Sequence, residues 1–292
     1  MTRRRALFAA GLVALLALSG CDINKKTASA RTTPRPSPSV NSAMKAIAGM
    51  QPGPSAAAGE RLSSNFSNPG GAASGYTFDQ FLTYIIKDVD KYWSGVWRTA
   101  NLTEPQVTYD WLAPGETVAM ACTDGATGQM VAGDSTAAYC PADDTIRVSE
   151  VVAQSVWDGQ LKANTDPETG HQAGDFSVAY VVAHEYAHNL QAELGLIPSA
   201  AHPNGGGYPV YKTELHADCW AGVWANSAYY EGLLEAGDVE EAFRTTADVG
   251  DYDFTDAGGH HGTPAQRVKA FMDGYNSGVP RNCDPYLLTD YS

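Results

Sequence analysis

Two histidines and a glutamate are the residues of this sequence whose types and spacing could carry chemistry. His184 and His188 are four positions apart, and Glu185 directly follows the first histidine. Positions i and i+4 share one face of a helix, so both imidazoles can bind the same metal ion. The glutamate then lies beside that ion and can accept a proton from water. This HExxH spacing predicts a zinc site with Glu185 as the general base. The competing interpretation is a surface helix that carries these residues without a function.

A catalytic zinc ion needs a third protein ligand and one open position. The metzincin extension of the motif is excluded, because Gln191 and Leu194 occupy the positions of its glycine and histidine. Further along, Glu214 and Asp218 are again four residues apart. Glu214 is the predicted third ligand, and Asp218 can hold a ligating histidine by its second ring nitrogen. His202, in a loop, is the rival third ligand.

Two predicted helices must position these side chains. Residues 175–195 predict one helix, with Asp175 or Ser177 as its cap and the HExxH group in its middle. A loop rich in proline and glycine leads to a second predicted helix over residues 213–230, which carries Glu214. The metal site is therefore expected between two helices.

The remaining elements predict an α+β fold, a zincin-like single domain with helices packed on a small mixed sheet. Residues 145–149 alternate in polarity and predict a strand, which we expect to be the sheet edge that aligns a peptide substrate. Other helices are predicted from capping boxes, in which two side chains bond to the first backbone amides. The other expected elements are a strand over residues 106–111, a helix over residues 78–97 capped by Thr77 and Gln80, and helices begun by Asp238 with Glu241 and by Thr263 with Gln266.

The first 75 residues predict export and a tether. Residues 1–20 carry three arginines and then an apolar run too short to span a bilayer, in the order of a signal peptide. The following Cys21 ends a Leu-Ser-Gly-Cys segment that resembles a bacterial lipobox, so we expect it to be lipidated. A plain secretory signal with a stray cysteine is the alternative. Residues 21–75 are rich in Ser, Ala, Pro and Gly and predict a disordered tether, which leaves residues 76–292 as the folded domain.

The charge balance excludes one class of partner. The chain has 33 acidic and 19 basic residues, for a formal net charge of −14. Phosphate backbones and anionic lipid surfaces attract basic proteins. We therefore expect no binding to nucleic acid, and contact with a membrane only through the lipid anchor.

Four segments together resemble a known family. They are VAHEYAHNLQ at residues 182–191, ELHADCWAGVWA at 214–225, GDVEEAF at 237–243 and HGTPAQRV at 261–268. The sequence from about residue 76 to residue 286 is similar to the bacterial putative neutral zinc metallopeptidases. The resemblance implies a zincin fold, zinc ligands His184, His188 and Glu214, and Glu185 as the base.

The cysteines predict two disulfides in an oxidising compartment. Without Cys21, four cysteines remain, and four cysteines allow three pairings. The family resemblance favours the pairs Cys122–Cys140 and Cys219–Cys283. The alternative for Cys219 is a buried free thiol.

His261 is predicted to donate a hydrogen bond to the peptide carbonyl oxygen, on which negative charge develops when water attacks. It follows a glycine-rich turn and precedes the capped helix at Thr263, which could fix its imidazole. The family resemblance places a histidine at this point too. His260, Tyr208 or Tyr211 could serve instead, and the histidine could also be solvated and have no role.

These expectations combine into one predicted function. The chain is expected to be a monomeric zinc metalloendopeptidase that hydrolyses peptide or protein substrates. Its place is the extracytoplasmic face of the cell envelope, where the lipid anchor holds it. The alternative is a non-catalytic lipoprotein whose zinc ion only stabilises the fold and whose acidic surface binds an envelope partner. Glu185 favours the enzyme, because a purely structural zinc site has no use for it.

Overall fold

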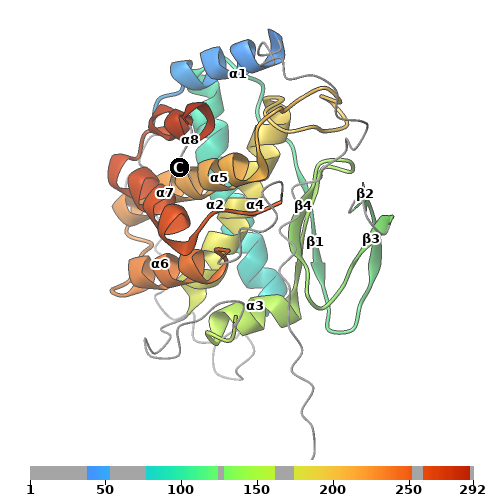
Figure 1. Ribbon diagram of the computed structural model, residues 1–292. Coiled ribbons are helices and arrows are strands. Elements are labelled where there is room, and N and C mark those ends of the chain that lie inside the picture. Colours follow the sequence, from blue (N-terminus) through green and yellow to red (C-terminus); the bar gives the residue numbers. More distant parts are fainter. Residues whose placement is uncertain (1–37, 53–76, 124–127, 162–173, 252–258, 290–292) are drawn as a thin grey trace, which may run out of the picture.

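The computed structural model describes residues 38–52, 77–123, 128–161, 174–251 and 259–289 (Figure 1). The predicted signal peptide and Cys21 lie outside these residues. Within the described ranges, no helix is both long enough and apolar enough to cross a membrane.

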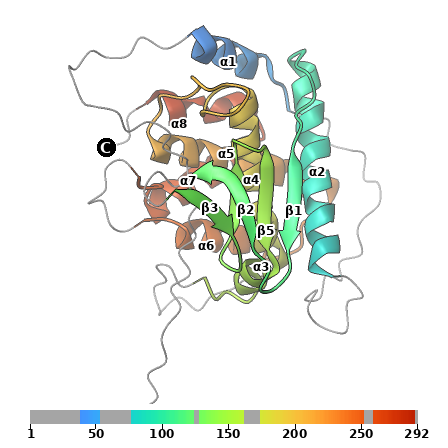
Figure 2. The ribbon, with the colours of Figure 1, turned by 90° about the vertical axis from the view of Figure 1, so that its right-hand side faces the viewer.

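Helices and strands form two layers, which confirms the predicted α+β class. In Figure 1 most helices lie on one side of a small sheet, and Figure 2 shows the strands in front of α4 and α5. The sheet has the order β1 (Thr108–Leu112), β5 (Thr145–Ser149) and β4 (Ala137–Cys140). Strand β1 runs parallel to β5, and β4 runs antiparallel to it. The sheet is therefore mixed, as predicted.

The prediction that residues 145–149 form the sheet edge is wrong. Strand β5 has these bounds, but it lies in the centre of the sheet and all five of its residues are buried. The edge beside helix α4 is β4. Strand β4 was not predicted, because its four residues, Ala-Ala-Tyr-Cys, are all buried and show no alternation.

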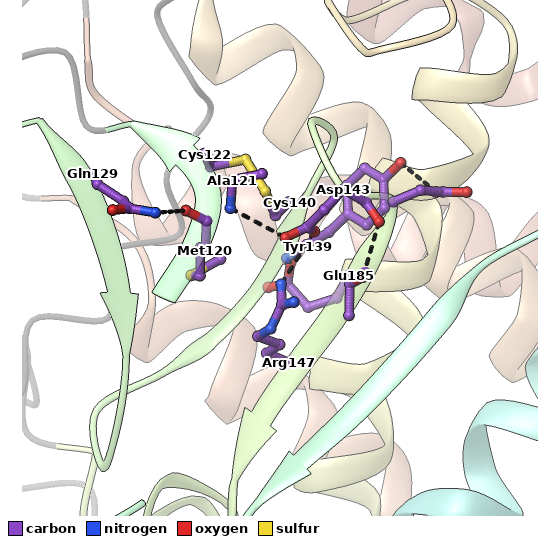
Figure 3. Close-up of a disulfide and its surroundings, with 11 residues drawn as sticks. Met120, Ala121, Cys122, Gln129, Tyr139, Cys140, Asp143, Arg147 and Glu185 are labelled. Atoms are coloured by element: carbon purple, nitrogen blue, oxygen red, sulfur yellow. Dashed lines mark hydrogen bonds and ion pairs between the residues drawn. A yellow bond between two sulfur atoms is a disulfide. The ribbon is translucent and has the colours of Figure 1, made fainter. Parts of the chain in front are cut away.

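A hairpin of β2 (Val118–Thr123) and β3 (Gln129–Ala132) flanks this edge. The predicted disulfide between Cys122 and Cys140 joins β2 to β4 (Figure 3). Asp143 adds a second link, because its carboxylate accepts a hydrogen bond from the N–H of Ala121 at 3.1 Å.

Helices α4 (Asp175–Glu193) and α5 (Val210–Glu231) form the centre of the molecule. Nearly every residue of α4 is buried, because other helices and the sheet surround it. Helix α2 (Phe78–Thr99) covers one side of this central pair and begins with the predicted capping box of Thr77 and Gln80. The remaining helices are α3 (Glu150–Trp157), α6 (Asp238–Asp248), α7 (Pro264–Ser277), the 3-10 helix η1 (Pro280–Cys283) and α8 (Asp284–Leu288).

Two predicted helix caps differ from the structure. The N-cap of α4 is Gly174, and the carboxylate of Glu241 accepts a hydrogen bond from the N–H of Phe176 at 3.2 Å. Glu241 therefore caps α4 and not its own helix, and the predicted capping box at Asp238 does not form because α6 begins after Gly237. A carboxylate from a neighbouring helix satisfies the same backbone donors that a local cap would.

Helix α7 lies against α5 at very short range. A Cβ atom at Gly222 of α5 would collide with the carbonyl of Phe271, and one at Gly274 of α7 would collide with the carbonyl of Cys219. Each glycine thus faces the backbone of the other helix, and the two together permit the close approach. The predicted capping box of Thr263 and Gln266 begins α7, with Pro264 as its first residue.

A helix lies inside the range predicted to be a disordered tether. Helix α1 spans Pro38–Gly49, and Ala43, Ile47 and Met50 are buried in the core. Their spacing of three and four residues gives the helix one apolar face. The average composition of residues 21–75 concealed this short pattern, so the folded part begins earlier than residue 76.

Candidate metal centre

Three side chains from α4 and α5 converge on one point. The Nε2 atoms of His184 and His188 are 3.1 Å apart. Glu214 brings one carboxylate oxygen to 3.2 Å from the Nε2 of His184 and the other to 3.3 Å from the Nε2 of His188. All three side chains are buried. These are the three ligands predicted from the sequence.

The spacing of these atoms fits a zinc ion. Ligand atoms about 2.0–2.1 Å from a tetrahedral zinc ion lie about 3.3 Å from one another. Apart from the imidazoles of His184 and His188, neither carboxylate oxygen of Glu214 finds a hydrogen-bond partner among the described residues, although both are buried. A buried carboxylate with so few partners is costly, and a cation between it and the imidazoles removes that cost. Two nitrogens and one oxygen are also ligand types that zinc accepts.

The electrostatics of the site favour an ionised glutamate. Burial alone would raise the pKa of Glu214, but the charges and hydrogen bonds of His188 and His184 hold that pKa well below its usual value. For His184, burial lowers the pKa, yet the carboxylate of Asp218 outweighs burial and raises it to about 9. The metal-free site therefore attracts positive charge.

Asp218 lies where the sequence predicts it. Its Oδ1 is 2.8 Å from the Nδ1 of His184, so the other ring nitrogen, Nε2, faces the ligand cluster. The same oxygen accepts a hydrogen bond from the hydroxyl of Tyr180 at 2.6 Å. The guanidinium of Arg267 also contacts both oxygens of Asp218. Tyr180 and Arg267 were not predicted to belong to the site.

His188 has a matching partner that was also not predicted. Its Nδ1 is 2.9 Å from Oε1 of Gln191, which lies one helical turn later. The amide nitrogen of Gln191 donates to the carbonyl of Thr213 at 2.8 Å and lies 3.1 Å from Nδ1 of His216. Burial lowers the pKa of His216 to about 3, so this histidine is neutral and accepts that contact. Gln191 thus joins the two ligand helices.

Glu185 faces both the ligand cluster and the sheet. Its Oε2 accepts a hydrogen bond from the backbone N–H of Tyr139 in β4 at 2.7 Å, as Figure 3 shows. Its Oε1 is buried and has no hydrogen-bond partner among the described residues. Burial raises the pKa of Glu185, while the charges of His184 and His188 oppose that rise. One oxygen is therefore anchored, and the other is available to accept a proton.

The predicted oxyanion donor lies in the segment before α7. The Nδ1 of His261 is 3.0 Å from Asp251, and its ring is partly exposed. Its neighbour His260 stacks on Tyr211 with 4.9 Å between the ring centres. The role of His261 as the oxyanion donor stays a prediction.

His202, the rival third ligand, does not join the ligand cluster. Its Nε2 is 3.1 Å from the carbonyl of Glu193, and the clustered ligands are His184, His188 and Glu214.

Tyr208, a rival oxyanion donor, has a buried hydroxyl, and burial and the charge of Asp284 raise its pKa.

The second predicted disulfide, Cys219–Cys283, is present. It rules out a free thiol at Cys219. The bond ties α5, which carries Glu214, to the 3-10 helix η1 near the C-terminus.

Some of the missed residues left a signal in the sequence. Gln191 is three residues after His188, so helical spacing places it on the same face. Arg267 lies in the HGTPAQRV segment, of which only the histidine was predicted to be functional. Tyr139 acts through its backbone, and the sequence holds no signal for that contact.

Comparisons with known proteins agree with this site. The family described as Putative neutral zinc metallopeptidase matches residues 46–286. The chain is 32% identical to YpfJ of Escherichia coli strain K12 over 186 residues, which are 57% of this chain and 58% of YpfJ. It is 34% identical to Rv2575 of Mycobacterium tuberculosis strain H37Rv over 172 residues, which are 52% of this chain and 55% of Rv2575. The matches thus span little more than half of these relatives. No solved structure matches the chain. The chain belongs to the putative neutral zinc metallopeptidase family.

Proposed function

We propose that this protein is a zinc-dependent peptidase with its active site between α4 and α5. The observation that carries the proposal is the cluster of His184, His188 and Glu214, whose ligand atoms lie within 4.8 Å of one another. Glu185 belongs to the same electrostatic network, because the charges of all three ligands act on its carboxylate. Three protein ligands with a carboxylate beside them are the arrangement of a catalytic zinc site, whereas structural sites use four ligands.

The residues of this chain divide the chemistry among them. A bound zinc ion supplies Lewis acidity, which lowers the pKa of water and polarises a peptide carbonyl. Oε1 of Glu185 accepts the proton of the attacking water, and the same carboxyl group can deliver it to the amine that leaves. The bond between Oε2 and the N–H of Tyr139 keeps the carboxylate in place during both transfers.

The substrate of the proposed enzyme is a peptide that adds a strand to β4. The N–H of Ser149 donates to the carbonyl of Thr136, and the antiparallel register then turns the backbone groups of Ala137 and Tyr139 away from β5. The N–H of Tyr139 donates to Glu185, so this outer edge faces the site, and the outward groups left to pair with a peptide are those of Ala137 and the carbonyl of Tyr139. An extended peptide paired there would place its carbonyl near the metal.

The N-terminal segments support a place for the enzyme outside the cytoplasm. The segment that ends at Cys21 has the order of a lipoprotein signal, and two structural disulfides are typical of oxidising compartments. We propose that a lipid on Cys21 holds the protein at the extracytoplasmic face of the cell envelope, where it acts on peptides or proteins as a monomer.

Glu185→Gln in the full-length protein tests the proposed activity. We expect this variant to keep about one zinc ion per chain and to lose hydrolysis of a peptide library by at least about 10²-fold, because only the proton acceptor is removed. Glu193→Gln is the matched control, since Glu193 lies on the same helix and bonds to the backbone of Gln106. The control should hydrolyse peptides normally.

Each outcome separates the proposal from its alternative. Undiminished turnover in Glu185→Gln would move the base to another residue. A wild-type protein that binds zinc but cleaves no member of the library would favour the non-catalytic lipoprotein. His184→Ala should lose the metal in either case, and full zinc content in that variant would contradict the ligand assignment.

A further inference from the structure

Arg267 is a fully buried arginine beside the ligand cluster. Its Nε donates to Oδ2 of Asp218 at 2.8 Å, and one terminal nitrogen donates to Oδ1 at 2.9 Å. Both Arg267 and Asp218 have no exposed surface. Two parallel bonds between a planar guanidinium and a carboxylate fix the orientation of both groups.

The other contacts of the guanidinium hold it rigidly in this position. A second terminal nitrogen donates to the carbonyl of Val249 at 3.0 Å. The hydroxyl of Tyr180 lies 3.4 Å from the nitrogen that also contacts Oδ1 of Asp218. That nitrogen is 3.7 Å from Glu214 and 3.5 Å from the ring of His184. Arg267 is therefore adjacent to two of the three ligands.

The two parallel hydrogen bonds between Arg267 and Asp218 also affect the orientation of the His184 imidazole. Oδ1 of Asp218 lies 2.8 Å from Nδ1 of His184. Because Arg267 holds both oxygens of Asp218, the direction of that hydrogen bond is set, and so is the orientation of the imidazole. The ring then presents Nε2 to the ligand cluster. Without Arg267, the hydroxyl of Tyr180 would hold this carboxylate by Oδ1 alone, so the carboxylate could rotate and take the imidazole with it.

We infer that Arg267 is a positioning residue of the metal centre, which acts through Asp218 on His184. The inference rests on the proposed zinc site. It also explains what the HGTPAQRV segment contributes: the cap at Thr263 begins α7, and the glycine contact between α5 and α7 brings Arg267 to Asp218. This segment therefore supports the metal site through Arg267, and this contribution does not depend on a role for His261.

A double-mutant cycle in zinc affinity tests this chain of contacts. The zinc dissociation constant is measured by competition with a chromophoric chelator for the wild type, Arg267→Met, Asp218→Asn and the double variant. Loss of an outer partner of a metal ligand costs about 10- to 100-fold in affinity. We expect each single variant to lose about that factor. The double variant should bind zinc no more than about threefold weaker than Asp218→Asn, because Arg267 acts through Asp218.

A purely structural role predicts a different result. In that case the two losses would multiply in the double variant, and this outcome would overturn the inference. So would wild-type affinity in folded Arg267→Met. If Arg267→Met does not fold, Arg267→Lys takes its place in the cycle. Lysine keeps the positive charge but cannot form the two parallel hydrogen bonds to Asp218. Arg267→Lys should weaken zinc binding several-fold, and unchanged affinity in that variant would equally contradict the inference.

Arg147→Met is the matched control for removal of a buried arginine. Arg147 is 3.1 Å from Asp143, and it lies on β5 where side-chain alternation directs it away from the face of Ile146 and Val148, which belong to the main core. This variant should lose stability and keep wild-type zinc affinity. The readout also separates this inference from the proposed activity. If the wild type binds zinc but hydrolyses no peptide, the proposed peptidase activity is refuted and the zinc affinities of the four proteins can still be compared. If hydrolysis is normal but the two losses of zinc affinity multiply in the double variant, only the role of Arg267 is refuted.

Discussion

The backbone N–H of Tyr139 donates to the carboxylate of Glu185 at 2.7 Å, although 46 positions separate the two residues. This bond connects the edge strand β4 to helix α4, which carries the ligands His184 and His188. The disulfide partner Cys140 directly follows Tyr139, so the β2–β3 hairpin is attached beside the same contact (Figure 3). The position of the proposed base therefore depends on how firmly β4 is held.

Removal of the disulfide next to Tyr139 should affect both stability and turnover. The loop between Cys122 and Cys140 is short, and its closure contributes about 3 kcal/mol to the free energy of unfolding by the chain-entropy estimate. We expect the double variant Cys122→Ser with Cys140→Ser to lose about that amount in urea unfolding. Its kcat should fall several-fold because β4 is less firmly held, while its zinc content stays that of the wild type.

The outcome that contradicts this prediction is unchanged kcat in a protein that has lost the expected stability. The disulfide would then stabilise the hairpin without supporting Glu185.

Gln191→Leu should weaken zinc binding by about 10- to 100-fold. The amide oxygen of Gln191 is the partner of Nδ1 of His188, and leucine offers no acceptor. Gln191→Glu is the informative comparison, because a carboxylate still accepts from His188 but no longer donates to the carbonyl of Thr213. It should keep zinc affinity and lose stability. Equal zinc affinity in wild type and Gln191→Leu, measured by chelator competition, would leave Gln191 with a packing role alone.

Local patterns predicted a large part of the structure. The capping boxes at Thr77 and Thr263 depend on residues three positions apart, and both are present. The ligand cluster was predictable for the same reason, because His184 with His188, and Glu214 with Asp218, are neighbours on their helices. The contact between the two pairs required only that the helices pack together.

Contacts between distant segments account for what the sequence did not predict. The cap of α4 comes from Glu241, which lies 65 positions from Phe176. Arg267 reaches Asp218 across 49 positions, and only the packing of α5 on α7 brings them together. The alternation of residues 145–149 predicts a half-buried strand, yet both faces of β5 are covered. Such contacts depend on tertiary packing, which local pattern does not encode.

Stability should fall as the pH rises from about 4 to about 7, because of Asp238. Burial raises its pKa to about 7, and the nearby carboxylates of Asp175, Glu241 and Glu235 add to that rise. The folded state thus retains a proton that the unfolded chain releases near pH 4, so the contribution is present at low pH and lost as the pH passes 7. We expect Asp238→Asn to unfold at a higher temperature than the wild type at pH 8, by a few °C for about 1 kcal/mol.

The difference between the two proteins should shrink towards pH 4.5, where Asp238 is protonated in the folded wild type. Asparagine retains the carbonyl oxygen that accepts from the N–H of Glu235, so the local backbone contact survives the substitution. A difference in melting temperature that is the same at both pH values would show that Asp238 stays ionised in the folded state.

Helix α1 should contribute to the stability of the folded part. Ile47 is fully buried and belongs to the main core, so Ile47→Ala is expected to cost about 2–5 kcal/mol in the free energy of unfolding. Lys45→Ala on the same helix is the control, because Lys45 is exposed. Urea unfolding of both variants measures the difference. Wild-type stability in Ile47→Ala would mean that residues 38–52 do not stay docked on the core.

His261→Ala is expected to lower kcat by about 10²-fold, with KM little changed and zinc retained. Asp251 accepts hydrogen bonds from both the backbone N–H of His261, at 2.6 Å, and its Nδ1, at 3.0 Å. The ring is thereby held with Nε2 directed away from Asp251, and a partly exposed imidazole can reach a substrate without a rearrangement of the core. Asp251→Asn should lower kcat by a smaller factor, because asparagine loosens the ring but leaves the donor. His260→Ala distinguishes the neighbour, which stacks on Tyr211. Steady-state kinetics of the three variants decide among them: wild-type kcat in His261→Ala together with a large loss in His260→Ala would assign the developing charge to His260.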